Sequence, residues 1–184
     1  MLRPSDLERH GISRVQLGEA VETGLVQRAG RGLYRLAEAE SVTENHVFAE
    51  VARRVPKGTF CLLSALRFHN LTTQNPHDAW VALPPGAWRP RLDFISLRIV
   101  HLSGERLTSG VETHDIEGVP VRVFSPAKTV ADCFKFRNKI GLDVALEALR
   151  ETWRERRATM DEITRFATTC RVANVMRPYL ESLT

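Results

Sequence analysis

The first part of the chain alternates between short helical patterns and glycine-bearing turns. Residues 5–11 combine a capping box, Ser5 to Glu8, with a glycine stop, which predicts one short helix. Residues 13–24 repeat the start and stop signals, with Leu17, Ala20 and Val21 on one face. Residues 25–28 and 33–36 are strand-like and flank a glycine-bearing turn, which predicts a hairpin.

This order of helix, tight turn, helix and hairpin is typical of a winged helix-turn-helix over residues 1–36. A polar stretch, residues 37–44, then separates it from a second domain over residues 43–184. That domain begins with an amphipathic helix near residues 44–54, followed by a short apolar segment over 62–71. Short β-like runs then predict a small sheet at 79–83, 97–100, 111–114 and 119–123.

Helices are expected for the rest of the chain. Ser125 followed by Pro126 is a helix start, and a capping box at Thr159 and Glu162 is another. A further helix runs from Leu142 to Trp153, and a last one over 172–183 contains a proline. The predicted buried stripe of the 142–153 helix consists of Leu142, Leu146, Leu149 and Trp153. The chain is therefore expected to have an α+β fold.

Composition fits this two-domain prediction. Of the 184 residues, 43% are hydrophobic and 26% are charged, which is enough apolar side chain for a real core. The net charge is +4, and 22 of the 26 basic residues are arginines, which suit phosphate and guanine edges but are also inflated by GC-rich genomes. No stretch approaches a membrane span or a secretory signal, so we expect a cytoplasmic protein.

Candidate chemistry is concentrated at the N-terminus. In a winged helix-turn-helix, the start of the second helix and the hairpin dock on DNA. We expect Arg14 and Gln16 to contact bases. Ser13 and Arg3 are expected to contact the DNA backbone and so position the domain on the duplex. The wing contacts would come from Arg28, Arg31 and Arg35. Glu19 and Glu22 on the same helix would repel phosphate, so a protein-contact module without DNA binding stays open as an alternative.

Enzyme motifs are not found. The sequence has no His-Glu-x-x-His, no phosphate-binding glycine loop, no Gly-x-Ser-x-Gly and no Cys-x-x-Cys, so we expect neither catalysis nor a cofactor or metal. His69 and His114 are expected to be structural. The three cysteines are odd in number and far apart, which argues against a disulfide framework, and buried thiols are expected. A basic surface is expected on the helix after Ser125, formed by Lys128, Lys135, Arg137 and Lys139.

Three strings resemble the AbiEi-type antitoxin family. They are Gly11 to Leu36, then Cys61 to Thr73, and above all Val119 to Phe134, which contains Ser-Pro-Ala-Lys-Thr. The resemblance implies a bacterial antitoxin that represses its own operon, in systems often linked to phage defence. It further implies binding of the N-terminal domain to inverted repeats in promoter DNA, and a C-terminal domain that counters a nucleotidyltransferase-like toxin.

Two departures from the family pattern matter. A winged helix normally has another helix before the pair, so we expect residues 1–36 to lack the first helix. Some proteins with a similar Ser-Pro-Ala-(Arg/Lys)-Thr string continue into a restriction-endonuclease-like nuclease domain. Such a domain needs strand-borne carboxylates for metal-assisted cleavage. The acids after Asp132 instead lie in helical patterns, so the nuclease is the less favoured alternative.

Overall fold

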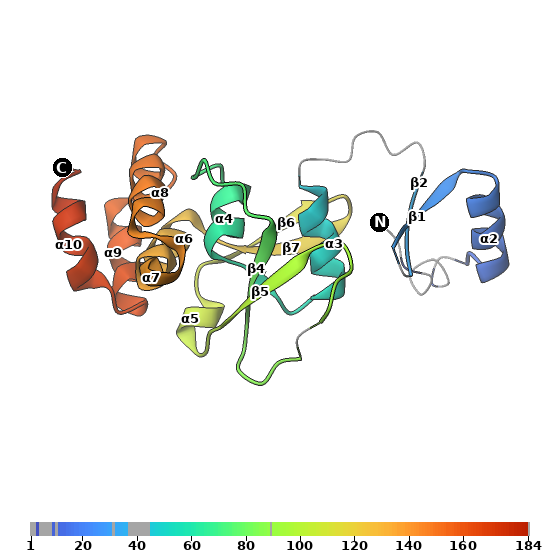
Figure 1. Ribbon diagram of the computed structural model, residues 1–184, viewed down its shortest axis with the longest axis horizontal. Helices are drawn as coiled ribbons and strands as arrows, with labels where there is room; N and C mark the ends of the chain where they lie inside the picture. Colours follow the sequence, from blue (N-terminus) through green and yellow to red (C-terminus); the bar gives the residue numbers. More distant parts are fainter. Residues whose placement is uncertain are drawn as a thin grey trace. The chain divides into compact units, whose positions relative to one another are not determined.

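The computed structural model describes residues 3, 9, 11–30, 32–36, 45–88 and 90–183 (Figure 1). The fold is α+β, as the sequence predicted. The chain forms two compact units, one of residues 1–53 with 115–120 and the other of residues 54–114 with 121–184. The expected capping box at Ser5 and Glu8 and the polar stretch over 37–44 lie outside the described residues.

The N-terminal part of the first unit is a helix followed by a hairpin. Helix α2 (Arg14–Glu22) precedes strands β1 (Val26–Gly30) and β2 (Leu33–Leu36), which pair antiparallel with an irregularity between Arg28 and Gly30. Leu17 and Leu33 are buried. The second predicted helix and the hairpin are thus confirmed.

The same unit contains helix α3 (His46–Arg54) and the turn between strands β6 and β7. The predicted apolar stripe of α3 is confirmed at Phe48 and Val51, which are buried. Glu117 and Gly118 both have positive φ angles, 55° and 72°, which is the backbone of a type I′ turn. His46 Nδ1 lies 2.9 Å from Glu117 Oε2, so the turn is fastened to the start of α3.

The second unit is built on a mixed five-stranded sheet in the order β5-β4-β3-β7-β6. β3 pairs antiparallel with β4 and parallel with β7, while β4 and β5 are parallel. All four strands predicted from the sequence are present, and the two-residue β3 was missed. The strands are β3 (Thr59–Phe60), β4 (Asp78–Leu83), β5 (Ser96–His101), β6 (Val111–Ile116) and β7 (Val119–Phe124).

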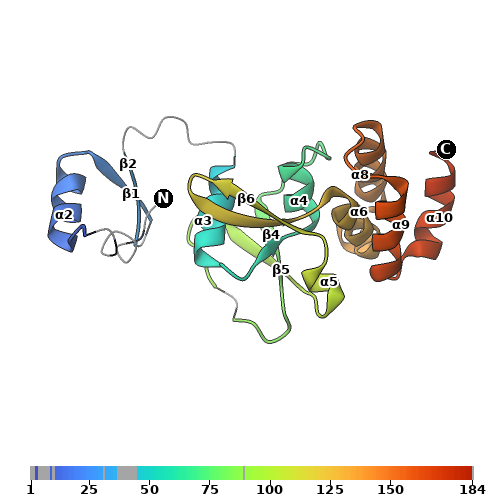
Figure 2. The same cartoon turned by 180° about the vertical axis from the view of Figure 1, so that it is seen from behind.

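Helices α4 (Leu62–Phe68) and α5 (Glu105–Thr108) lie in the sheet region, and the remaining helices form a cluster at the C-terminal end (Figure 2). Helix α6 is central, because it packs against α4, α8 and α9. The Ser125 hydroxyl accepts from the Lys128 amide, and Pro126 occupies the first turn, as predicted. The cluster comprises α6 (Pro126–Lys135), α7 (Arg137–Ile140), α8 (Leu142–Arg154), α9 (Met160–Thr169) and α10 (Ala173–Glu181).

The buried face of α8 confirms the prediction at Leu149 and differs from it at the other three positions. Leu142 is 38% exposed, and Leu146 and Trp153 are only half-buried. The face that meets α6 is lined mostly by small residues, which allow the two helices to approach closely. Its buried residues are Val144, Ala145, Ala148, Leu149 and Thr152.

Lys128 also departs from the prediction. Its side chain is fully buried, pairs with the Asp132 carboxylate, and lies with its ammonium 4.1 Å from the centre of the Phe124 ring. The expected basic surface therefore does not include Lys128, because Ala127 to Phe134 are all enclosed between the sheet and the neighbouring helices. Cys61, Cys133 and Cys170 are buried free thiols, as expected. In the described part of the chain, no helix is long and apolar enough to cross a membrane.

Candidate nucleic-acid interface

The start of α2 is fixed by a reciprocal cap. The Ser13 hydroxyl accepts from the Gln16 amide at 3.3 Å, and the Gln16 carboxamide oxygen accepts from the Ser13 amide at 2.9 Å. A capping box of this kind satisfies two backbone donors at the helix end. The cap holds the first turn of α2 in place and orients the side chains that it carries.

That first turn is displayed to solvent. Arg14, Val15 and Gln16 are exposed, and Val15 exposes 71% of its surface. These residues combine a cation, a methyl-bearing side chain and a carboxamide, which are the groups that read phosphates, thymine methyls and adenine edges. Gln16 uses its carboxamide oxygen in the cap, so a two-point contact to adenine requires release of that bond.

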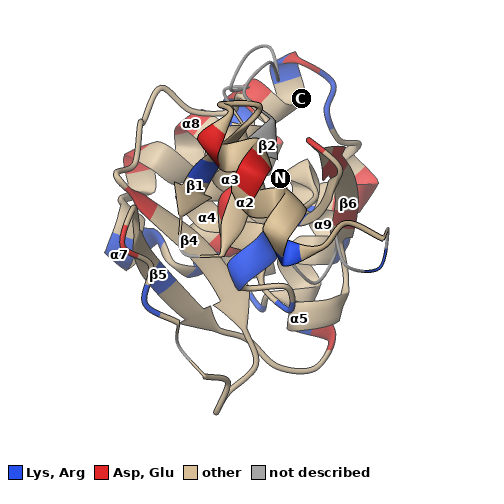
Figure 3. Ribbon diagram, turned by 90° about the vertical axis from the view of Figure 1, so that its right-hand side faces the viewer, with Lys and Arg blue, Asp and Glu red and all other residues tan. Residues whose placement is uncertain are grey.

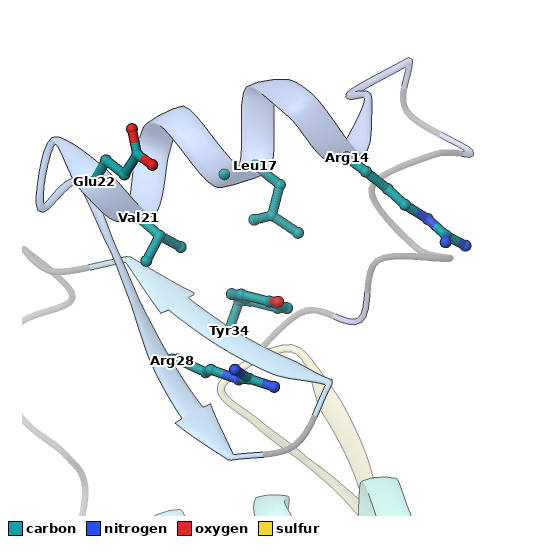
Figure 4. Close-up of a pocket in the computed structure, with 7 residues that line it drawn as sticks. Arg14, Leu17, Val21, Glu22, Arg28 and Tyr34 are labelled. Atoms are coloured by element: carbon teal, nitrogen blue, oxygen red, sulfur yellow. The ribbon is translucent and has the colours of Figure 1, made fainter.

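A hollow of about 580 Å³ lies between α2 and the hairpin (Figure 4). Leu17 and Val21 point from the helix towards Tyr34 on β2, while Glu22 points away from the hairpin. Arg14 at one end of α2 and Arg28 on β1 line the same hollow. The fold thus brings together two arginines that are distant in sequence, on the helix and on the hairpin.

Charge on α2 is divided along its length. Arg14 stands at the first position of the helix, and Glu19 and Glu22 occupy its last turn. Figure 3 shows basic and acidic residues on this one helix. A polyanion would therefore be attracted to the start of α2 and repelled from its end, which favours docking by the first turn.

The remaining predicted N-terminal contacts have different outcomes. Arg3 is half-buried, and Arg28 is exposed on β1 opposite Tyr34. Arg31 and the side chain of Arg35 lie outside the described residues. Tyr34 was not among the predicted site residues, because its place in the hollow depends on the packing of the hairpin against α2.

The predicted basic residues of the C-terminal domain are separated by the fold. Lys135 and Lys139 are exposed, and the Lys139 ammonium lies 5.6 Å from the Phe136 ring centre. Arg137 is half-buried and donates to the Phe134 carbonyl at 2.9 Å. Lys135, Arg137 and Lys139 remain a candidate surface, but Lys128 does not belong to it.

The histidines considered at the sequence level lie together. His69 is buried and donates from Nε2 to the Phe124 carbonyl at 2.8 Å, and burial lowers its pKa. The centre of the His114 ring lies 4.8 Å from that of Phe68 and 6.3 Å from that of His69. The Nε2 atom of His114 lies 3.3 Å from Glu112 Oε2. Within the described ranges, no group of three His, Cys, Asp or Glu side chains is arranged to hold a metal ion.

Comparison with known proteins bears on the segment that carries α2 and the hairpin. Residues 1–37 match a family described as "Transcriptional regulator, AbiEi antitoxin". The N-terminal segment is AbiEi-like. This match confirms the resemblance of the Gly11 to Leu36 string, and it covers the capped helix, the hairpin and the arginines of the hollow. No curated protein matches the chain.

The AbiEi match ends where the hairpin ends, so it applies to one part of the protein. The C-terminal strings that resemble the same family, over 61–73 and 119–134, lie outside the matched residues. Their assignment to an AbiEi C-terminal domain stays a prediction. The structure adds that residues of both strings, in α4, at the end of β7 and in α6, contribute to the buried hydrophobic cluster.

Proposed function

We propose that this protein is a DNA-binding transcriptional regulator and the antitoxin of a toxin-antitoxin pair. One observation carries the proposal. The AbiEi-like segment presents a rigidly capped helix start, with Arg14 and Gln16 exposed, beside a hairpin that carries Arg28. A helix start that enters a groove and a hairpin that follows the phosphates are the two contacts of a winged helix on DNA.

The proposed target is an inverted repeat in the promoter of its own operon. In this reading Arg14 and Gln16 contact base edges, Ser13 and Arg3 position the backbone, and the arginines of the hairpin contact phosphates. The proposal assigns no catalytic step to the chain. Its biological partner is a nucleotidyltransferase-like toxin, in a defence system against phage.

A reporter assay tests the regulatory half of this proposal. The upstream DNA of the operon is placed before a reporter, and repression by the full chain is compared with repression by Gln16→Ala and by Arg171→Ala, an exposed arginine at the end of α9. We expect the Gln16 change to relieve repression and the Arg171 change to leave it intact. Full repression by the Gln16 variant would remove that residue from the proposed base contacts.

Co-expression tests the antitoxin half separately. Growth arrest by the neighbouring nucleotidyltransferase-like protein should be relieved by this chain and also by its Arg14→Ala/Arg28→Ala variant, since the neutralising activity is assigned to the second domain. If neither form restores growth, the antitoxin assignment fails while the DNA-binding assignment still stands on the reporter.

A second candidate is a protein-contact module without DNA binding. The carboxylates of Glu19 and Glu22 on α2 favour it, as does the exposure of the apolar residues Val15 and Leu25, which show 71% and 61% of their surface. Replacing Glu19 and Glu22 by glutamine separates the two functions. The change strengthens binding to DNA if phosphates approach α2, and weakens binding to a basic protein partner if the helix docks on one.

A further inference from the structure

A second hollow lies at the junction of α8 and α9, in the unit that the AbiEi match does not cover. Its volume is about 710 Å³, within the range of sites that hold small ligands. Its chemistry is dominated by one aromatic ring and three guanidinium groups. The lining residues are Trp153, Arg154, Arg156, Arg157, Ala158, Thr159, Met160 and Glu162.

Trp153 is the aromatic residue of this hollow, which Ala158 and Met160 also line. The indole is half-buried and does not belong to the hydrophobic cluster that the described residues of α6, α8, α9 and α10 form. A tryptophan left at the surface in this way offers a flat ring for stacking. Any of the nucleic-acid bases can stack on such a ring, because every base has a flat aromatic face.

Three arginines line the hollow together with Trp153. Arg154 pairs with Glu151, and Arg157 Nε lies 3.3 Å from Glu155. The arginine side chains of both pairs are exposed, and surface ion pairs are weak enough to yield to a stronger anion. Arg156 is exposed and has no ion-pair partner among the residues that the structure describes.

The carboxylate that lines the hollow is already engaged. Glu162 Oε2 accepts from the Thr159 amide at 2.8 Å and from the Thr159 hydroxyl at 2.9 Å, and these bonds lower the pKa of Glu162. The capping box therefore uses the helix start of α9, and an incoming anion would meet the arginine side chains rather than the helix end. The charges available to a ligand are predominantly positive.

We propose that this hollow binds single-stranded nucleic acid, with one base stacked on Trp153 and neighbouring phosphates on Arg154, Arg156 and Arg157. A half-buried indole and guanidinium groups lining one hollow are the kind of surface on which unpaired strands bind. An acidic protein segment would use the arginines but would have no need of the indole. This activity is additional to the proposed binding of promoter DNA, which uses the first unit.

The test uses the full chain and a fluorescein-labelled ten-nucleotide oligouridine RNA, with and without the Arg14→Ala/Arg28→Ala change. That change weakens the promoter site, so binding that persists in it belongs elsewhere in the protein. Anisotropy gives the affinity. Arg156→Ala is compared with Arg171→Ala, because both arginines are exposed and both have a positive φ, 53° and 57°, at a helix end.

We expect Trp153→Ala and Arg156→Ala each to weaken binding at least about fivefold. Arg171→Ala should stay within about twofold of the parent protein. With Trp80 and Trp88 replaced by phenylalanine, the oligonucleotide should quench the remaining Trp153 fluorescence. If the double replacement does not fold, the anisotropy comparison alone decides.

Four outcomes would overturn the proposal. One is absence of oligouridine binding, another is equal loss in the Arg156 and Arg171 variants, and the third is full retention of affinity in Trp153→Ala. In a competition experiment, polyglutamate is added at the same concentration of charges as the oligonucleotide. Displacement of the oligonucleotide would show that the site is a non-selective basic patch, and this outcome would also contradict the proposal.

Discussion

Lys128 and Asp132 form an ion pair one turn apart inside α6, and neither side chain exposes more than 1% of its surface. The pair is supported by neighbours, since the Cys170 thiol donates to Asp132 Oδ1 at 3.2 Å and the Phe124 ring faces the Lys128 ammonium. Asp132 thus connects α6 with the end of α9. The thiol contact, rather than the ion pair within α6, joins the two helices at this point.

The first prediction concerns this pair. Lys128→Met should lower the free energy of unfolding by about 3 to 5 kcal/mol, because it leaves the Asp132 charge buried without its partner. Lys128→Met/Asp132→Leu removes both charges and should recover most of that loss. Urea denaturation of the two variants measures both values. A cost below about 1 kcal/mol for the single change would contradict a stabilising role of the Lys128–Asp132 ion pair.

The three thiols supply a second prediction. Burial raises the pKa of Cys61 and Cys133 well above the ordinary value and raises the pKa of Cys170 to about 12. A thiol that stays protonated and covered reacts slowly with disulfide reagents. We expect no rapid reaction with Ellman's reagent in the native protein and three equivalents in guanidinium chloride. A fast-reacting thiol under native conditions would contradict the packing around α6.

A third prediction follows from His69. Burial lowers its pKa from the ordinary value of 6.5, so the unfolded chain takes up a proton at a higher pH than the folded one. Between the two pKa values the unfolded state binds more protons, and stability rises with pH. The contribution is complete above about pH 6.5 and is lost as the pH falls through the folded pKa.

Urea denaturation at pH 7.5 and 5.5 checks this dependence. The loss of stability on acidification should be smaller in His69→Gln than in the unchanged protein, because the titrating group is gone. His77→Gln, which changes an exposed histidine, should keep the full loss. Equal pH dependence in both variants would mean that His69 does not carry the effect.

Gly110 supplies a fourth prediction. Its φ is +67°, and a Cβ there would lie 2.8 Å from Lys128 Cβ and 2.8 Å from Phe166 Cζ. Gly110→Ala should therefore cost the strain of a positive φ together with about 1 to 3 kcal/mol of overpacking. Gly86 also has a positive φ but faces open space, so Gly86→Ala should cost only the backbone strain. Equal losses of thermal stability in the two variants would contradict the close approach of the backbone at Gly110 to α6.

Local signals in the sequence were sufficient for most of the fold. The cap at Ser13, the proline start at Pro126 and the capping box at Thr159 each act over three or four residues, and the structure contains all of them. Strand β3 was missed because it is two residues long and exists through pairing with β4 and β7, which are distant in sequence.

Side-chain environment was harder to predict than backbone. Lys128 was predicted to lie at the surface because charged residues are usually exposed. Asp132, four residues later, could have indicated a buried ion pair within the helix. On α8, the large residues Leu142 and Trp153 suggested the packed face, whereas close contact with α6 selected Ala145 and Ala148. In the candidate site, too, the local backbone signal was predicted and the side-chain environment was not. The cap at Ser13 was predicted, whereas the contribution of Tyr34 to the hollow was not.

The most direct test of the central claim is a salt titration of binding to the DNA upstream of the operon. The unchanged chain is compared with Arg14→Ala/Arg28→Ala and with Arg171→Ala/Arg177→Ala, which removes the same charge from exposed positions in the C-terminal part. We expect the first variant to lose affinity and to reduce the salt slope by about two, and the second to match the parent. Equal binding of upstream and scrambled DNA, or equal behaviour of the two variants, would contradict DNA recognition by the N-terminal segment.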